Sequence, residues 1–228
     1  MQTNTGNMIR IMVVDDHKLF RSGLISLLQT QQNLFVVGEA SDGEECEDIY
    51  FTLNPDILLI DIEMPKRNGI ETIRSIKELD KNVKAIVLTQ HENESVIARA
   101  FEAGAMGYMN KDIILGELLY AINTVLSGNI YFGPAYTRAR LEELVIRLNE
   151  LEEMYDPESY KLTPREIEVI LLIATGLTSL EIADSLNIKK RTVDSIRKNI
   201  SDKCNFSGGH QLLKFAVWYK KNRHLFKQ

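Results

Sequence analysis

Five short apolar runs, each followed by a helical pattern, fill the first half of this 228-residue chain. Apolar residues between the runs recur every three or four positions, as Phe20, Leu24 and Leu28 do. Nearly continuous apolar strands alternating with amphipathic helices are typical of a parallel sheet covered on both faces. The pattern therefore predicts a doubly wound α/β domain over residues 8–127. The expected strands are 9–14, 34–37, 57–60, 85–88 and 107–109.

The segment 128–160 is predicted to be a helical linker, with one helix over about 136–154 that ends before Asp156 and Pro157. Four leucines in this helix follow the 3-4-3 spacing of a coiled-coil seam. The seam can join two copies of the chain or pack against one of the chain's own domains, and the sequence leaves both open. The seam consists of Leu141, Leu144, Leu148 and Leu151.

Residues 161–228 contain only helical patterns. Thr163 and Glu166 form a capping box at the start of one helix, and Thr178 and Glu181 repeat it at the next. A short helix near 179–186 is followed by a longer basic helix near 190–204, which is the helix-turn-helix plan. In the longer helix Val193, Ile196 and Ile200 form the expected core-facing stripe, which leaves polar and basic residues on the remaining surface.

Charge divides unequally between the two regions. Residues 8–127 carry 11 Lys and Arg against 19 Asp and Glu, a net charge of −8. Residues 161–228 carry 13 against 6, a net charge of +7. This asymmetry indicates two domains with different partners, and the basic one is a candidate for binding nucleic acid.

The remaining composition favours a cytoplasmic protein. No apolar run approaches the roughly 18–20 residues that cross a bilayer, so no membrane partner is expected. Cys46 and Cys204 form neither a metal-binding spacing nor a disulfide framework, which fits a reducing cytosol. Residues 1–7 are polar and are predicted to be a disordered lead-in rather than a signal peptide.

Acidic and reactive residues follow the predicted strands. Asp15 and Asp16 end the first strand, Asp61 the third and Thr89 the fourth, while Lys111 follows the fifth. In a doubly wound sheet these strand ends meet at one crevice. Three carboxylates with no His or Cys nearby suit Mg²⁺, and a carboxylate beside Mg²⁺ can attack phosphorus to form an aspartyl phosphate.

The segments IMVVDDHKLFRSGL, PDILLIDIEMPKRNGIE, AIVLTQH and AGAMGYMNKD resemble the receiver domains of two-component response regulators over nearly all of 8–127. This resemblance implies a five-stranded parallel sheet of order 2-1-3-4-5 and a sensor histidine kinase as partner. Asp61 would be the phosphoacceptor, and Lys111 would pair with the phosphoryl group. The resemblance also implies Mg²⁺ ligands at Asp15, Asp16, Asp61 and the backbone carbonyl of Glu63, and switch residues at Thr89 and Tyr108.

The segment LTPREIEVILLIATGLTSLEIADSLNIKKRTVDSIRKNISDKC resembles the four-helix DNA-binding domain of the LuxR/NarL type over about 160–222. This implies double-stranded DNA as a partner and a homodimer on two half-sites, with the seam at 141–151 as one possible dimer contact. The candidates for base contacts are Asp194, Ser195 and Lys198. The candidates for phosphate contacts are Lys190, Arg191, Thr192, Arg197 and Lys203.

Together these features predict a transcriptional regulator in which phosphorylation of Asp61 controls dimerisation and DNA binding. It would perform no turnover beyond self-catalysed phosphoryl acceptance and slow hydrolysis. Two other functions remain open: a Mg²⁺-dependent phosphohydrolase, which Asp61-Ile62-Glu63 faintly suggests, and an adaptor that binds proteins instead of DNA.

Overall fold

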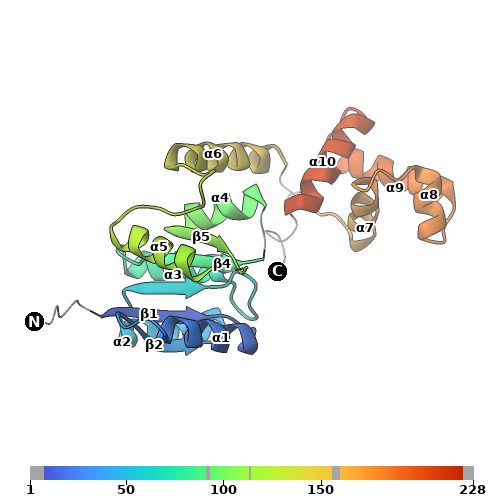
Figure 1. Ribbon diagram of the computed structural model, residues 1–228. Helices are drawn as coiled ribbons and strands as arrows, with labels where there is room; N and C mark the ends of the chain where they lie inside the picture. The colour runs from blue at the N-terminus through green and yellow to red at the C-terminus, as the bar shows by residue number, and fades with distance from the viewer. Residues whose placement is uncertain (1–7, 91–92, 113, 156–159, 223–228) are drawn as a thin grey trace, which may run out of the picture. The chain divides into compact units, whose positions relative to one another are not determined.

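The structure is a computed structural model that describes residues 8–90, 93–112, 114–155 and 160–222 (Figure 1). The predicted lead-in and the predicted helix break at Asp156 and Pro157 lie outside the described residues. The chain divides into two compact units, Met1–Leu148 and Asn149–Gln228. Each unit has a hydrophobic core of its own and is described by itself.

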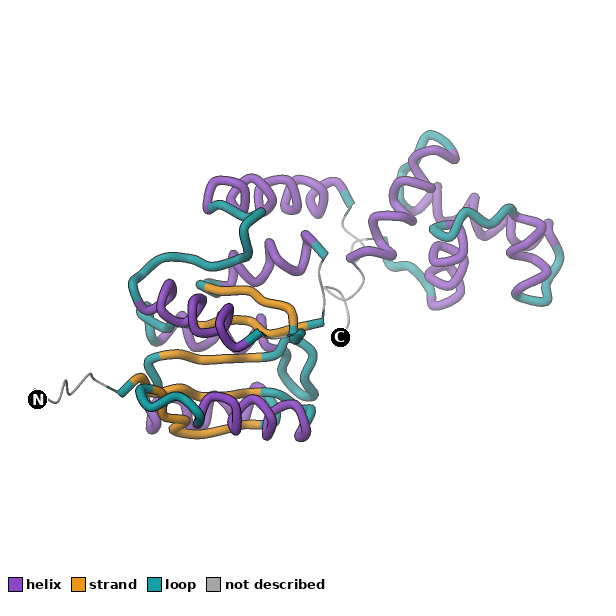
Figure 2. Tube along the Cα trace, in the orientation of Figure 1, coloured by secondary structure: helices purple, strands orange, loops and turns teal. Residues whose placement is uncertain are grey.

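A five-stranded sheet forms the centre of the first unit. Its order is β2-β1-β3-β4-β5 and every neighbouring pair is parallel, so the predicted topology is confirmed. Because all strands run in one direction, their carboxyl ends lie along one edge of the sheet (Figure 1), and helices flank the sheet on both faces (Figure 2). The strands are β1 Ile9–Val14, β2 Leu34–Ala40, β3 Ile57–Ile60, β4 Ala85–Thr89 and β5 Gly107–Asn110.

Helices cover both faces of this sheet, as the apolar strands require. Ile11 and Val13 of β1 pack on the side of α1 and α5, while Met12 and Val14 pack on the side of α2, α3 and α4. This alternation follows from the two-residue period of a strand and buries both faces. The helices are α1 Lys18–Gln29, α2 Gly43–Leu53, α3 Gly69–Leu79, α4 Glu94–Ala103 and α5 Leu115–Leu126.

The first unit continues past Gly128, where the sequence suggests that the α/β domain ends. Tyr131 forms an isolated bridge with Gly107 at the free edge of β5, and Phe132 is buried in the core. The helix α6, Arg138–Met154, then begins, and Leu141 is buried in the same core. The linker is therefore fastened to the receiver-like unit by both backbone pairing and apolar packing.

The second unit consists of α7 Pro164–Ile173, α8 Ser179–Ser185, α9 Lys190–Lys203 and α10 Gly209–Asn222. Both predicted capping boxes are present and set the starts of α7 and α8. The expected stripe of α9 faces inward: Val193 and Ile200 are fully buried, and Ile196 packs against the same core. The predicted helix-turn-helix arrangement of α8 and α9 is thus confirmed.

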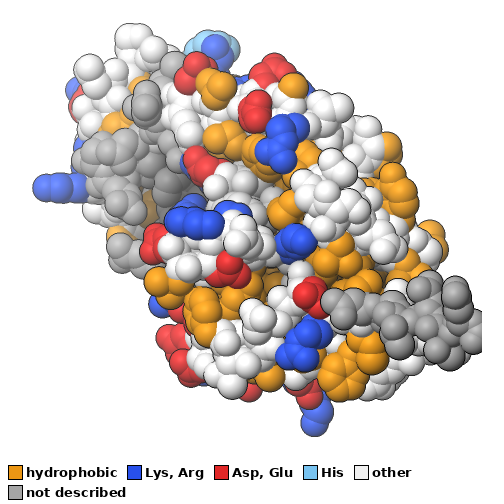
Figure 3. Space-filling model, turned by 90° about the vertical axis from the view of Figure 1, so that its left-hand side faces the viewer, with side chains coloured by type: hydrophobic (Ala, Val, Ile, Leu, Met, Phe, Trp, Pro, Cys, Tyr) orange, Lys and Arg blue, Asp and Glu red, His pale blue; other side chains and the backbone are white. Residues whose placement is uncertain are grey.

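Within the described part of the chain, no helix has the length and apolar character of a membrane span. The face of the molecule drawn in Figure 3 carries acidic and basic side chains interspersed with apolar ones. This mixed face contrasts with the basic surface of α9 described below.

Candidate functional site

Three carboxylates gather at the carboxyl edge of the sheet. The oxygen-bearing side chains of Asp15, Asp16 and Asp61, together with His17, place one potential ligand atom each within 4.8 Å of one another. Asp15 and Asp61 are only 1% and 3% exposed, because they extend directly from buried strands. Parallel strands β1 and β3 are neighbours in the sheet, so residues 46 positions apart in sequence meet here. Three carboxylates held together, two of them buried, require a compensating cation.

Lys111 supplies one such cation. Its ammonium nitrogen lies 2.6 Å from a carboxylate oxygen of Asp61 and 2.7 Å from one of Asp15. The ammonium also sits 4.9 Å from the ring centroid of Phe20, a cation–π contact. Burial opposes the charged form of Lys111, but the hydrogen bonds to Asp15 and Asp61 outweigh it and raise its pKa. Lys111 is therefore a fixed positive charge between two acidic side chains.

Burial also affects Asp61. Removal from water raises the pKa of this carboxyl group above its ordinary value, and the hydrogen bond from Lys111 only partly offsets that effect. The neighbouring backbone N–H of Ile62 donates to the same carboxylate at 2.7 Å. One oxygen of Asp61 is thus held by Lys111 and the other by the backbone, which fixes the direction of the side chain.

His17 corrects one part of the sequence argument. The expectation that no histidine lies near the carboxylates is wrong, since Nδ1 of His17 lies 2.7 Å from Asp16. His17 precedes α1, where the chain turns from β1 into the helix, and this turn brings its ring back towards Asp16. Its side chain is 67% exposed, whereas the carboxylates of Asp15 and Asp61 are buried. The two buried ligands, Asp15 and Asp61, are oxygen donors of the kind that Mg²⁺ prefers, and Nδ1 of His17 lies 3.4 Å from Asp15 on the exposed side of the site.

The loop after β3 folds back against Asp61. Gly69, the first residue of α3, approaches so closely that a Cβ atom there would lie 1.9 Å from the carbonyl oxygen of Asp61. Its N–H donates to the carbonyl of Ile62 at 3.0 Å. Glu63, whose carbonyl is the expected metal ligand, is an exposed residue of this loop. The glycine thus permits the close approach of the first residue of α3 to the backbone of Asp61.

Thr89 and Tyr108 occupy different environments. Thr89 ends β4, is 1% exposed, and accepts a hydrogen bond on its carbonyl from the N–H of Lys111 at 2.9 Å. Tyr108 lies inside β5, is 6% exposed, and stacks on Phe132 with ring centroids 6.1 Å apart. Thr89 therefore belongs to the same sheet edge as the carboxylates, whereas Tyr108 packs against the linker.

Arg21 also belongs to the surroundings of the carboxylates, although it was not among the residues predicted from the sequence. Its guanidinium group, on α1, donates to the backbone carbonyl of Asp15 and to the carboxylate of Glu39, the latter at 2.8 Å. The side chain is only 12% exposed, which is unusual for an arginine. The sequence offered one signal for this role. Arg21 is a basic residue that follows the acidic pair by about one and a half helical turns, on a helix that packs on the sheet. Arg21 holds the segment that carries Asp15 and Asp16.

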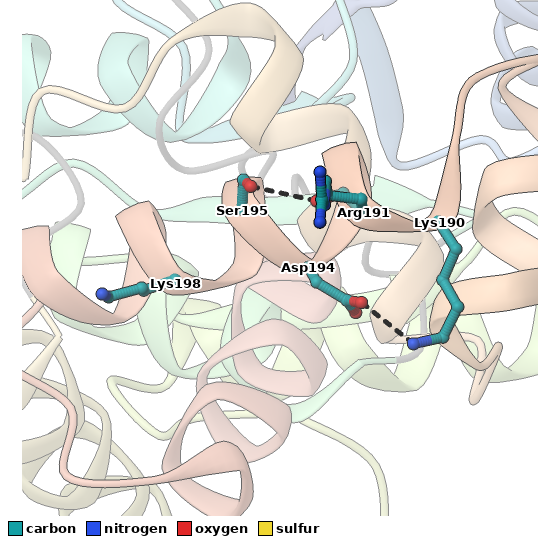
Figure 4. A pocket seen from close by; sticks show the side chains of 5 residues that line it. All are labelled: Lys190, Arg191, Asp194, Ser195 and Lys198. Atoms are coloured by element: carbon teal, nitrogen blue, oxygen red, sulfur yellow. Dashed lines mark hydrogen bonds and ion pairs between the residues drawn. The ribbon is translucent and has the colours of Figure 1, made fainter.

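A second candidate surface lies on α9. Five of its side chains line an open depression of about 490 Å³ and project from the outer face of the helix (Figure 4). The ammonium of Lys190 pairs with Asp194 at 2.9 Å, while Ser195 donates to the carbonyl of Arg191. Lys198 points away from that pair (Figure 4). The predicted Thr192 is likewise exposed, and Arg197 is half-buried.

Lys203 has a different environment from the other basic residues of α9. Its ammonium lies 2.7 Å from the carboxylate of Glu166, which is 6% exposed, and 3.3 Å from the carbonyl of Lys161. This side chain is held by its own domain at the end of the helix. The carboxylate of Asp194 also has a partner on another helix, because the Ser179 hydroxyl of α8 donates a hydrogen bond to it.

Two family models match the chain. Residues 11–123 match the response regulator receiver domain, and residues 160–216 match the LuxR family of bacterial regulatory proteins. The first match contains the carboxylate cluster and Lys111, and the second contains α7, α8 and α9.

Relatives of known role align over nearly the whole chain. The transcriptional regulatory protein DegU of Brevibacillus brevis is 34% identical over 94% of this chain and 96% of its own. The response regulator UvrY of Escherichia coli is 33% identical over 92% and 94%. Among solved structures, the response regulator ChrA has a TM-score of 0.54 at 28% identity, covering 95% of this chain and all of that one. The RcsB–DNA complex has a TM-score of 0.53 at 25% identity, covering 92% and 98%.

These matches span both units, in the same order, and include proteins described as transcriptional regulators. The family is one of signal-dependent transcription factors and not of classical enzymes. The chain belongs to the two-component response regulators that combine a receiver domain with a LuxR-type DNA-binding domain.

Proposed function

We propose that this response regulator accepts a phosphoryl group on Asp61 from a sensor histidine kinase and thereby controls DNA binding by α9. The observation that carries this proposal is the position of Lys111, whose ammonium lies between the buried carboxylates of Asp61 and Asp15. Such a fixed cation beside a nucleophilic carboxylate is arranged to stabilise the negative oxygens of an incoming phosphoryl group.

A magnesium ion fits the oxygen donors of this site. Asp15, Asp16 and Asp61 would hold it, together with the backbone carbonyl of Glu63, as an oxygen-rich set suited to a hard cation. When bound, the ion would neutralise charge on the phosphoryl oxygens. The three carboxylates support this assignment, because the single positive charge of Lys111 balances only one of their negative charges.

The chain's own residues would perform the transfer. A carboxylate oxygen of Asp61 attacks the phosphorus of a phosphohistidine, so that a P–O bond forms while the P–N bond breaks and the imidazole departs with the electron pair. Lys111 moves its hydrogen bond to a phosphoryl oxygen, and the Thr89 hydroxyl donates to another. Hydrolysis of the acyl phosphate would return Asp61 to its starting state, with no other turnover.

The basic face of α9 would enter the major groove of double-stranded DNA. The exposed side chains on this helix are of the types that contact base edges and phosphates. The base contacts are assigned to Asp194, Ser195 and Lys198. The phosphate contacts are assigned to Lys190, Arg191, Thr192 and Arg197. Lys203 is left out of this set because Glu166 already holds it.

Binding would involve a homodimer on two half-sites, since one small helix-turn-helix domain buries little surface on DNA. The leucine seam of α6 is not the favoured dimer contact. Leu141, Leu144 and Leu148 are already buried against this chain's own first unit. The side chain of Leu151 lies outside the described residues. A protein acting on the chromosome in this way would work in the bacterial cytoplasm.

Intact-mass spectrometry after incubation with acetyl phosphate and Mg²⁺ tests the phosphoacceptor. The wild type should gain the mass of one phosphoryl group, and Asp61→Asn should gain none. An equal gain in both proteins would show that Asp61 is not the acceptor. Continuous turnover of a generic phosphate ester, instead of one slow stoichiometric cycle, would favour the phosphohydrolase reading.

A further inference from the structure

The loop between β3 and α3 carries part of the proposed metal site. It begins at Asp61, directly after β3, and leads to Gly69, the first residue of α3. Glu63, whose backbone carbonyl is the proposed Mg²⁺ ligand, lies near its start. A carbonyl of the backbone cannot be aimed by rotating a side chain, so its direction depends on how the loop itself is held.

The loop makes a sharp turn at Lys66. This residue has a φ of 62°, in the left-handed region that side chains other than glycine rarely adopt. The next residue, Arg67, donates its N–H to the carbonyl of Pro65 at 2.8 Å. A conformation of this kind persists only where surrounding contacts hold it. The turn therefore requires support from a neighbouring element.

The beginning of α2 supplies that support. The ammonium nitrogen of Lys66 lies 2.7 Å from a carboxylate oxygen of Asp42, the N-cap residue of α2. The N–H of Gly43 donates to the carbonyl of Arg67 at 3.3 Å, and the guanidinium group of Arg67 pairs with Glu47 on α2. Contacts of two consecutive loop residues thus fasten the turn to one helix end.

Asp42 is itself held firmly in place. It is 4% exposed, and its two carboxylate oxygens accept from the N–H of Glu45 at 3.0 Å and from Lys66. These hydrogen bonds, that from Lys66 above all, lower the pKa of Asp42 and keep it charged at neutral pH. A Cβ atom on Gly43 would lie 2.6 Å from the carbonyl oxygen of Arg67, so α2 directly abuts the loop.

We propose that Asp42 and Lys66 are positioning residues for the metal site, whose ion pair holds the β3–α3 loop so that the carbonyl of Glu63 can serve Mg²⁺. This inference rests on the proposed function, because it assigns what supports one ligand of that site. The side chain of Lys66 is 57% exposed, and an ion pair with one partner in water adds little to global stability. Its effect is therefore expected in the loop.

Two single substitutions distinguish positioning from simple electrostatics. Asp42→Asn removes a negative charge and leaves a residue that still caps a helix well. Lys66→Met removes a positive charge and keeps a side chain with a Cβ atom at the same φ. If only charge mattered, the first change would weaken binding of the Mg²⁺ cation and the second would tighten it. If the ion pair positions the loop, both changes weaken binding.

The full-length protein serves for the test. Isothermal titration calorimetry measures the affinity for Mg²⁺ alone, and hydrogen–deuterium exchange without metal follows the amides of residues 66–69. Tyr50→Phe is the matched control, since the Tyr50 hydroxyl also joins α2 to the end of α3 through Asp80, at 2.9 Å, but does not contact the loop. Lys66→Arg retains a cation that can pair with Asp42.

Asp42→Asn and Lys66→Met should each weaken Mg²⁺ binding about tenfold, in the range found for residues that support metal ligands. Both should accelerate exchange at residues 66–69. Tyr50→Phe should match the wild type in both measurements, and Lys66→Arg should remain close to it. Because Lys66 is largely exposed, its variants keep the test decisive should Asp42→Asn fail to fold.

Tighter or unchanged Mg²⁺ binding in Lys66→Met would overturn the proposal, as would unchanged exchange at residues 66–69. A Lys66→Arg variant as weak as Lys66→Met, or a Tyr50→Phe variant equally affected, would also contradict it. In all these cases the wild type still binds Mg²⁺, so the proposed function stands. A wild type that binds no Mg²⁺ would overturn both the metal site and this inference.

Discussion

The ammonium nitrogen of Lys111 lies 2.6 Å from a carboxylate oxygen of Asp61, and both side chains are almost completely buried. Lys111→Met should greatly slow formation of the aspartyl phosphate, because an apolar side chain cannot stabilise the phosphoryl oxygens. Removing one such electrostatic group costs about 10²–10³ in rate. Time-resolved intact mass with acetyl phosphate measures this, with Lys81→Met, an exposed lysine of the same unit, as control. A rate equal to that of the control would contradict the role of Lys111.

Arg21 is expected to position the acidic pair for metal binding. One nitrogen of its guanidinium group donates to the carbonyl of Asp15 and another donates to the carboxylate of Glu39. The single ammonium group of a lysine cannot reproduce this pair of contacts. Both Arg21→Lys and Arg21→Met should therefore weaken Mg²⁺ binding, by about tenfold or more, as loss of a residue that supports metal ligands typically does. Isothermal titration calorimetry gives the dissociation constants.

The direction in which Mg²⁺ affinity changes distinguishes a positioning role of Arg21 from a purely electrostatic one. Arg21 is a cation near the metal site, so a purely electrostatic role predicts tighter Mg²⁺ binding in Arg21→Met and no change in Arg21→Lys. That pattern would contradict the positioning role. Arg10→Lys is the matched control, since Arg10 also donates to backbone carbonyls, those of Leu53 and Asn54, at the other end of β1.

Lys198 and Lys203 should affect DNA binding differently, although both are on α9. Lys198 is exposed beside the candidate DNA surface, whereas Lys203 is paired with Glu166. Lys198→Met should weaken binding to a short duplex and reduce the slope of log affinity against log salt by about one. Lys203→Met should leave the slope nearly unchanged. Fluorescence anisotropy across a salt series measures both, and equal slopes for the two variants would contradict the assignment.

Glu166 should make the stability of the DNA-binding unit depend on pH. Burial by itself raises the pKa of this carboxyl group, but hydrogen bonds from Lys203 and Thr163 outweigh it and hold the pKa below its ordinary value of 4.5. A group with a lowered folded-state pKa stabilises the fold above its unfolded-state pKa, and that stabilisation is lost as pH falls through the folded-state value. The unfolding free energy should therefore decline as pH drops below about 4.5.

Trp218 is the single tryptophan and lies in the core of this unit, so its fluorescence during urea unfolding reports on the unit alone. Glu166→Gln should lower the unfolding free energy at neutral pH by about 1–3 kcal/mol, because Lys203 loses its charged partner. The variant should also lose part of the pH dependence. An unfolding free energy of the wild type that is the same above and below about pH 4.5 would contradict the role of Glu166.

Local sequence patterns predicted the strands and the carboxylate cluster well, because both depend on short-range periodicity and strand order. The expected bounds of β1 and β3 match the structure. β2 continues three residues beyond the expected end at residue 37. Its last part contains Gly38 and Glu39, which interrupt the apolar run, yet a strand at the edge of a sheet tolerates polar residues there.

Local sequence patterns did not predict which side chains meet in the folded protein. The leucine spacing of α6 revealed an apolar stripe but not what covers it, since a second copy and α4 offer similar apolar surface. The basic character of α9 likewise did not distinguish Lys203 from Lys198, because the partner of Lys203 is Glu166, 37 residues earlier. His17 and Arg21 were missed as neighbours of the carboxylates because their positions depend on how α1 leaves β1.

Control of DNA binding by the state of Asp61 is tested most directly by capture of genomic DNA. Wild type and Asp61→Asn are incubated with sheared genomic fragments, with and without acetyl phosphate, and the captured fragments are sequenced and quantified. Acetyl phosphate should increase capture of a defined set of fragments by the wild type and leave Asp61→Asn unchanged. Unchanged capture by wild type that carries the phosphoryl group, or an equal increase with Asp61→Asn, would contradict the proposed switch.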